Sequence, residues 1–133
     1  TLGGDAAQVR SWLLPVWELM LSRPDTLPDA QQLKLVTTLE AALDGIDAEW
    51  LARIESAQLG NPRDPRLLYL AGAACVERQL WGKAQALLAQ AAQRLQDGAL
   101  RSKAWRALAL LAEQRDATQA AADAWKNAAL SAD

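Results

Sequence analysis

The string Leu-Trp-Gly-Lys-Ala at residues 80–84 contains the turn and the first helical residues between two segments that both repeat apolar residues at helical spacing. Before the turn, apolar residues recur every three or four positions through residues 65–79, and after it they do so through residues 81–95. Two helices joined by so short a connection pack antiparallel to each other. The chain is therefore predicted to be built on a helical hairpin.

Small residues are predicted where the two helices of this hairpin approach each other. Gly72 and Ala84 hold these positions. A glycine inside a helix costs about 1 kcal/mol relative to alanine, so Gly72 indicates a packing requirement. Gly82 lies in the first turn of the second helix, where that cost is smaller. Trp81 is expected to cover the top of the hairpin, because its side chain is too large to stay exposed beside two apolar helices.

Composition favours an all-α chain. The 133 residues suit one domain, and 51% of them are hydrophobic, which is enough for a sizeable core. Alanine and leucine, the strongest helix formers, dominate, while phenylalanine is absent and tryptophan occurs six times, mostly at positions predicted to be in the core. Seven helices are predicted, at residues 5–21, 29–43, 48–59, 65–79, 81–96, 99–114 and from 117 onward.

Aspartates mark several of the predicted helix starts. Asp47 and Asp64 are expected to be N-caps, and Asp29 and Asp116 are each followed three residues later by glutamine, as in a capping box. Pro15 predicts a kink or break in the first helix. The face of that helix predicted to pack inward consists of Val9, Trp12, Leu13, Val16, Trp17 and Met20.

The helices recur in pairs with a period of about 34 residues, which is typical of helix-turn-helix solenoids. The strings Trp105-x-x-Leu-Ala and Trp125-x-x-Ala resemble the tetratricopeptide repeat. The predicted fold is an all-α, right-handed superhelix of tetratricopeptide-like helix-turn-helix repeats, with a plain helical bundle as the alternative. Residues 1–28 form a leading helix and linker, and residues 29–133 form one degenerate and two better repeats. The residues predicted to pack the repeats are Gly72, Trp81, Gly82, Ala84, Trp105, Ala109, Ala121 and Trp125.

The residue types argue against catalysis and metal binding. Histidine is absent, and most carboxylates lie at predicted caps or solvent-facing positions. Cys75 lies on an apolar face and is predicted to be a buried core thiol, and with Met20 it supplies too few soft ligands for zinc. No cofactor is predicted. The net charge of −2 does not favour nucleic acid, but the second half of the chain is the more basic and would attract an acidic partner.

Three strings, at residues 64–72, 80–85 and 104–109, resemble the C-terminal region of the HemY family, and Leu-Trp-Gly-Lys-Ala is the most specific of them. That family comprises bacterial inner-membrane proteins encoded among haem-biosynthesis genes, with membrane helices ahead of the repeats. The resemblance implies a non-catalytic repeat domain tied to late haem or porphyrin metabolism. Because the sequence begins at Thr1 and has no apolar run long enough to span a membrane, we expect a soluble piece of an inner-membrane protein.

In a superhelix of this type, the first helix of each pair lines the concave groove. The residues predicted to line it are Arg66, Tyr69, Ala73, Val76, Lys103, Arg106 and Leu110. Their cations suit a carboxylate of an acidic protein segment or of a porphyrin, whereas an ordinary solvated helix face is the alternative. The predicted function is a protein-interaction scaffold for haem-pathway proteins at the bacterial inner membrane, and the alternative is a porphyrin or haem carrier using the same groove.

Overall fold

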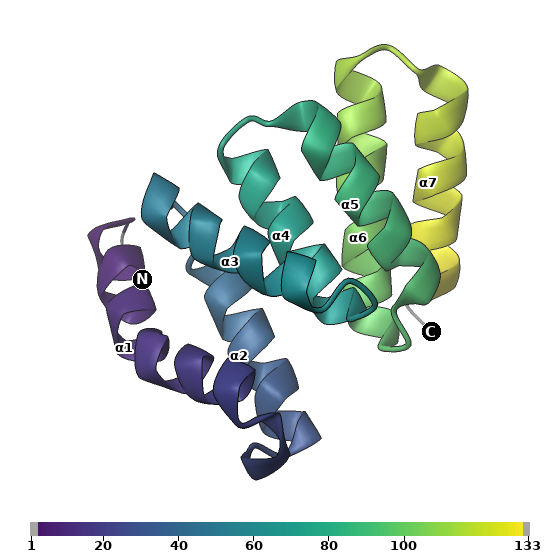
Figure 1. Ribbon diagram of the computed structural model, residues 1–133. Helices are drawn as coiled ribbons and strands as arrows, with labels where there is room; N and C mark the ends of the chain where they lie inside the picture. The colour runs from purple at the N-terminus through teal and green to yellow at the C-terminus, as the bar shows by residue number, and fades with distance from the viewer. Residues whose placement is uncertain (1–2, 132–133) are drawn as a thin grey trace.

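The computed structural model describes residues 3–131, and within that range all regular structure is helical (Figure 1). This confirms the predicted all-α class. The helices are α1 (Gly3–Ser22), α2 (Asp29–Ala41), α3 (Ala48–Gly60), α4 (Pro65–Glu77), α5 (Trp81–Arg94), α6 (Gly98–Gln114) and α7 (Thr118–Ser131), with a short 3-10 helix, η1 (Pro24–Thr26), after α1. Residues 1–2 and 132–133, the outer ends of the two predicted domain ranges, lie outside the described residues.

Aspartate side chains cap the N-termini of three helices. Asp47 accepts a hydrogen bond from the backbone N–H of Trp50 at 2.8 Å, and Asp64 accepts from two N–H groups of the first turn of α4. These two caps confirm the prediction, as does Pro65 in the first position of α4. Asp97 caps α6 in the same way. Each cap satisfies N–H groups that have no partner within the helix.

The two predicted capping boxes are wrong. The residue before α2 is Pro28, which has no capping side chain, and Gln32 reaches back to the carbonyls of η1 and Leu27 instead. Asp116 adopts a left-handed conformation with φ 58°, and Gln119 donates to Asp123 on the following turn. The spacing of aspartate and glutamine is therefore not sufficient, because the glutamine amide finds other acceptors close by.

Helix α1 is continuous across Pro15 and changes direction along its length, so the predicted kink is present and the alternative of a break is wrong (Figure 1). The proline lacks an N–H and crowds the carbonyl four residues before it, which bends the helix. Trp17 and Met20 are buried as predicted. Trp12, which is 66% exposed, and Val16 face solvent, so these two predictions are wrong. The buried face is rotated, and it includes Arg10.

Arg10 joins α1 to the C-terminal end of α2. Its guanidinium Nη1 donates to the carbonyl oxygens of Ala42 at 2.6 Å and Asp44 at 2.9 Å, and Nη2 donates to that of Gly45 at 3.5 Å. The last carbonyls of a helix lack intrahelical partners and carry the negative end of its dipole, so a cation is favourable there. Gly45 has φ 68°, which confirms the left-handed turn predicted to follow α2.

Helices α4–α5 and α6–α7 form two antiparallel hairpins with the same turn geometry (Figure 1). In each turn one residue, Gln79 or Asp116, adopts a positive φ, of 62° and 58° respectively. The amide after it donates to the carbonyl five residues back, as in a Schellman motif. The two bonds join Leu80 to Cys75 and Ala117 to Ala112, each at 2.8 Å. The two turn residues, Gln79 and Asp116, are farther apart in the sequence than the predicted repeat period of about 34 residues.

Gly72 confirms the predicted close approach of α4 and α5. A Cβ atom at this position would lie 2.7 Å from Cγ of Leu88 and 3.3 Å from its backbone nitrogen. Ala84 is fully buried, as predicted. Gly82, by contrast, has nothing within 4 Å of the position that a Cβ would take. A packing role for Gly82 is therefore wrong.

The other residues predicted to pack the repeats divide by size. Ala109 and Ala121 are buried and Trp105 is half-buried against the core. Trp81 is 42% exposed and Trp125 is 38% exposed, so the expectation that each would be covered is wrong. Trp81 is the first residue of α5 and lies over the end of α6, in a hollow that it shares with Leu111 and others, instead of closing the hairpin. Tryptophan is large and is rarely fully buried.

The pair α2–α3 is less closely associated than the two hairpins. Helix α2 packs against α1 and α4, and α3 packs against α4. Helices α1 and α3 meet through Trp17 and Trp50, whose ring centroids are 6.3 Å apart with the planes inclined at 63°. The edge-to-face arrangement of two buried rings joins the leading helix to the core.

Candidate functional site

Of the residues predicted to line a groove, Tyr69 and Lys103 meet at the same acid, Glu40. Residues Arg66, Tyr69, Ala73 and Val76 lie along α4, and Lys103, Arg106 and Leu110 lie along α6, which also contacts α4. Helix α2 extends this surface, because its acidic side chains reach Arg66, Tyr69 and Lys103. We call the seven predicted residues, together with Asp29 and Glu40 of α2, the groove face.

Glu40 links the three helices of the groove face. Its Oε1 accepts a hydrogen bond from the Tyr69 hydroxyl at 2.8 Å and one from Lys103 Nζ at 3.4 Å. Tyr69 is only 5% exposed, and its burial and then the charge of Glu40 raise the pKa of its hydroxyl well above the usual value. The phenol therefore stays neutral and serves as a donor. The tyrosine predicted to contact a ligand is mainly a link between α2 and α4.

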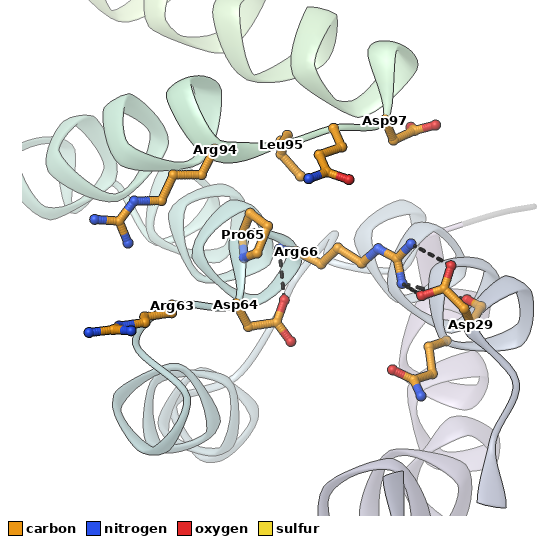
Figure 2. Close-up of a pocket in the computed structure, with 10 residues that line it drawn as sticks. Asp29, Arg63, Asp64, Pro65, Arg66, Arg94, Leu95 and Asp97 are labelled. Atoms are coloured by element: carbon orange, nitrogen blue, oxygen red, sulfur yellow. Dashed lines mark hydrogen bonds and ion pairs between the residues drawn. The ribbon is translucent and has the colours of Figure 1, made fainter. Parts of the chain in front are cut away.

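Arg66 pairs with Asp29 in a two-point ion pair. Guanidinium Nη1 lies 3.0 Å from Oδ1, and Nη2 lies 3.1 Å from Oδ2 (Figure 2). Figure 2 shows the Arg66 side chain extending from the start of α4 directly to the acid at the start of α2. The hydrogen bonds and charge of Arg66 lower the pKa of the Asp29 carboxyl below its ordinary value. A partner carboxylate would have to compete with Asp29 for this arginine.

Acid is expected to weaken this link between α2 and α4. Since the carboxyl pKa is lowered in the folded state, the pair stabilises the fold above the ordinary pKa of aspartate, and this contribution is lost as pH falls through the lowered value. Carboxyl NMR titration is expected to give a low pKa for Asp29 in the wild type and an ordinary one in Arg66→Ala. Equal values in both proteins would contradict the pairing. The effect on stability is expected to be small because Asp29 is exposed.

Arg106 is the cation of the groove face that remains available. It is exposed, and among residues 6–131, whose side chains the structure describes, it forms neither an ion pair nor a side-chain hydrogen bond. One helical turn further along α6 lies Leu110, which is 53% exposed. Burial and Glu40 raise the pKa of the Tyr69 hydroxyl, and the positive charge of Arg106 acts on it in the opposite direction. The groove face thus presents a free guanidinium beside an exposed apolar side chain.

A cleft of about 850 Å³ adjoins the groove face at the N-terminal ends of α2, α4 and α6. Arg63 and Arg94 line it, and in Figure 2 both side chains extend to the same side, away from the pair of Arg66 and Asp29. Neither arginine forms an ion pair with an acid among the described residues. These two cations and the acids of α2 were not predicted, because the contacts that place them join residues far apart in the chain.

Cys75 and Met20 occupy the core, which confirms their predicted structural role. Burial raises the pKa of the Cys75 thiol, so the reactive thiolate is disfavoured. Among the residues that the structure describes, His, Cys, Asp and Glu do not gather in threes or more in a way that would hold a metal ion.

No protein-family model, curated protein or solved structure gave a match to this chain. Between residues 3 and 131, none of the helices combines the length and the apolar character needed to span a membrane.

Proposed function

We propose that this chain is a non-catalytic protein-interaction domain that binds an acidic segment of a partner on its groove face. In this proposal, the pairs α2–α3, α4–α5 and α6–α7 are tetratricopeptide-like repeats of a right-handed superhelix, and α2, α4 and α6 form its concave side. The repeated turn geometry of the two hairpins supports this arrangement. Helices α2 and α3 are less closely associated than the helices of either hairpin, which agrees with one degenerate repeat.

The observation that carries the proposal is the unpaired Arg106 beside the exposed Leu110. Arginine binds carboxylates through two parallel hydrogen bonds, and an adjacent apolar side chain gives a partner residue area to bury. The link from Glu40 to Tyr69 and Lys103 holds the supporting helices in place. A preorganised surface loses less conformational entropy on binding, which favours recognition of a flexible segment.

A protein segment fits this region better than a porphyrin does. The adjoining cleft is lined mainly by arginines, aspartates and glutamines. Pockets for flat apolar ligands are lined mostly by hydrophobic and aromatic side chains. The tyrosine that could stack on such a ligand is buried. The charged lining therefore favours a scaffold over the carrier alternative.

The biological setting belongs to the same proposal. The Leu-Trp-Gly-Lys-Ala string at residues 80–84 and the Ala-Trp-Arg-Ala-Leu-Ala string of α6 resemble the HemY family. On that basis we propose that the partners are haem-pathway proteins, and that the parent protein acts at the bacterial inner membrane.

An affinity pull-down from a bacterial membrane extract tests the groove face. We expect the wild type to enrich a defined set of proteins and the Arg66→Ala/Lys103→Ala/Arg106→Ala variant to lose that set. Arg115→Ala is the control, since Arg115 is an exposed arginine at the end of α6 outside the groove face. Retention of the same proteins by the triple variant would contradict the proposed surface. Enrichment of proteins unrelated to haem synthesis would leave the surface supported and reject the pathway.

A further inference from the structure

The second hairpin, α6–α7, exposes a surface whose equivalent in the first hairpin is covered. When the two hairpins are aligned on their turn residues, Leu88 and Ala92 of α5 correspond to Trp125 and Ala129 of α7. Helix α6 packs against α5, and Leu88 and Ala92 are buried. Trp125 and Ala129 are exposed, and among the described residues α7 packs chiefly against α6.

We call this uncovered surface the end face, and it combines the exposed side of α7 with the adjacent side of α6. Its residues are Arg106, Leu110, Glu113, Ala122, Trp125 and Ala129. The indole Nε1 of Trp125 donates to Oε2 of Glu113 at 2.9 Å, which fixes the ring across the two helices. Hollows of about 320 and 350 Å³ lie on either side of the ring.

The two hollows have opposite charge. Arg106 and Ser102 line the first, whereas Glu113 and Asp116 line the second. Arg106 and Glu113 are two helical turns apart along α6, which corresponds to about 10 Å. A ligand lying along the groove between α6 and α7 would therefore meet a positive charge, an indole ring and a negative charge in that order.

We propose that the end face binds an amphipathic helix of a partner protein, seated on α6–α7 as α6 is seated on α4–α5. The packing of α6 on α4–α5 gives the geometry of the bound helix. The charges of Arg106, Glu113 and Asp116 give its specificity. A helix parallel to α6 would place an acidic residue at Arg106, leucine-sized side chains against Trp125 and Leu110, and a basic residue near Glu113 and Asp116. The required pattern is acidic at i, apolar at i+3 and i+4, and basic at i+7.

This inference rests on the proposed function only in requiring a protein partner, because most residues of the end face lie outside the groove face. Tryptophan and arginine are the residues most often found at the energetic centre of interfaces. Of the end-face residues, only Arg106 and Leu110 are shared with the groove face. Variants of Trp125 and Glu113 therefore test the end face alone, whereas Arg66 and Lys103 test the groove face alone.

The test uses a fluorescent, alanine-rich helical peptide carrying Glu at i, Leu at i+3 and i+4, and Lys at i+7, with a control peptide in which Glu and Lys are exchanged. Fluorescence anisotropy is expected to show tighter binding of the first peptide to the wild type. Trp125→Ala is expected to weaken binding by about tenfold or more. Lys126→Ala, at an exposed position of α7, is the matched control and is expected to bind normally.

A charge exchange tests the recognition with the Trp125 indole still present, although Glu113→Arg removes the hydrogen bond that this indole donates to Glu113. The Arg106→Glu/Glu113→Arg variant is expected to prefer the exchanged peptide, and Arg66→Ala/Lys103→Ala is expected to bind as the wild type does. Equal affinity of the wild type for both peptides, or unchanged binding by Trp125→Ala, would overturn the proposal. A dimer that is lost in Trp125→Ala, with no peptide binding, would also overturn it and would assign the surface to a second copy of the chain.

Discussion

Replacing Arg10 by alanine is expected to lower the free energy of unfolding by about 2–4 kcal/mol. The substitution removes a buried guanidinium that donates to the carbonyls of Ala42, Asp44 and Gly45 at the end of α2. Ala42 is itself buried, so its carbonyl loses a partner that water cannot easily replace. The cation also leaves the negative end of the helix dipole.

Urea unfolding followed by far-UV circular dichroism measures this effect. Arg23→Ala is the matched control, because Arg23 is exposed and its loss is expected to change stability by less than about 0.5 kcal/mol. Arg10→Lys is expected to recover only part of the loss, since an ammonium group cannot reproduce the geometry of the guanidinium. An Arg10→Ala protein as stable as Arg23→Ala would show that this contact does not hold α1 in place.

Gly72→Ala is expected to destabilise the protein even though alanine is the better helix former. The gain in helix propensity is about 1 kcal/mol. Against it, the added Cβ would lie 2.7 Å from Leu88 Cγ and 3.3 Å from Leu88 N. Rotation of the leucine side chain cannot relieve a contact with the backbone, so α5 must shift. Overpacking of this kind costs roughly 1–3 kcal/mol, so after the gain in helix propensity we expect a net loss of up to about 2 kcal/mol.

The glycine next to the turn provides the control for this substitution. Gly82→Ala adds the same methyl group to a helix where nothing lies within 4 Å, so stability is expected to be unchanged or to rise by up to about 1 kcal/mol. In a double-mutant cycle, Leu88→Ala is expected to cost less in the Gly72→Ala background than in the wild type, because the overlap is relieved. Additive effects would mean that Gly72 and Leu88 do not constrain each other.

The sequence was sufficient to predict the helices and most of their ends. Asp47, Asp64 and Pro65 act within one turn of the chain, and local rules apply well to such contacts. Gly72 was identified because glycine lowers helix stability, so its presence inside a helix indicates that another helix packs closely there. The capping box at Asp29 failed because Gln32 and the Asp29 carboxylate have other partners. The one at Asp116 failed because Asp116 lies in a left-handed turn and Gln119 donates to Asp123.

Tertiary contacts account for what the sequence did not reveal. Asp29 and Arg66 are 37 residues apart, and no local pattern indicates that they meet. Arg10 was not identified because an arginine on an apolar helix is ordinarily expected to face solvent. The burial of the tryptophans was mispredicted for another reason. Helix α1 carries large apolar residues on more than one face, so periodicity alone could not separate the buried Trp17 from the exposed Trp12.

Site-specific photo-crosslinking in a membrane extract tests most directly whether a partner protein contacts the groove face. A benzophenone amino acid would replace Lys103 on the groove face or Ala86, an exposed residue of α5 outside that face. We expect a discrete protein adduct from position 103 and none from position 86, and we expect Arg66→Ala/Arg106→Ala to abolish it. Equal labelling from both positions, or an adduct that persists in the arginine variant, would contradict the account.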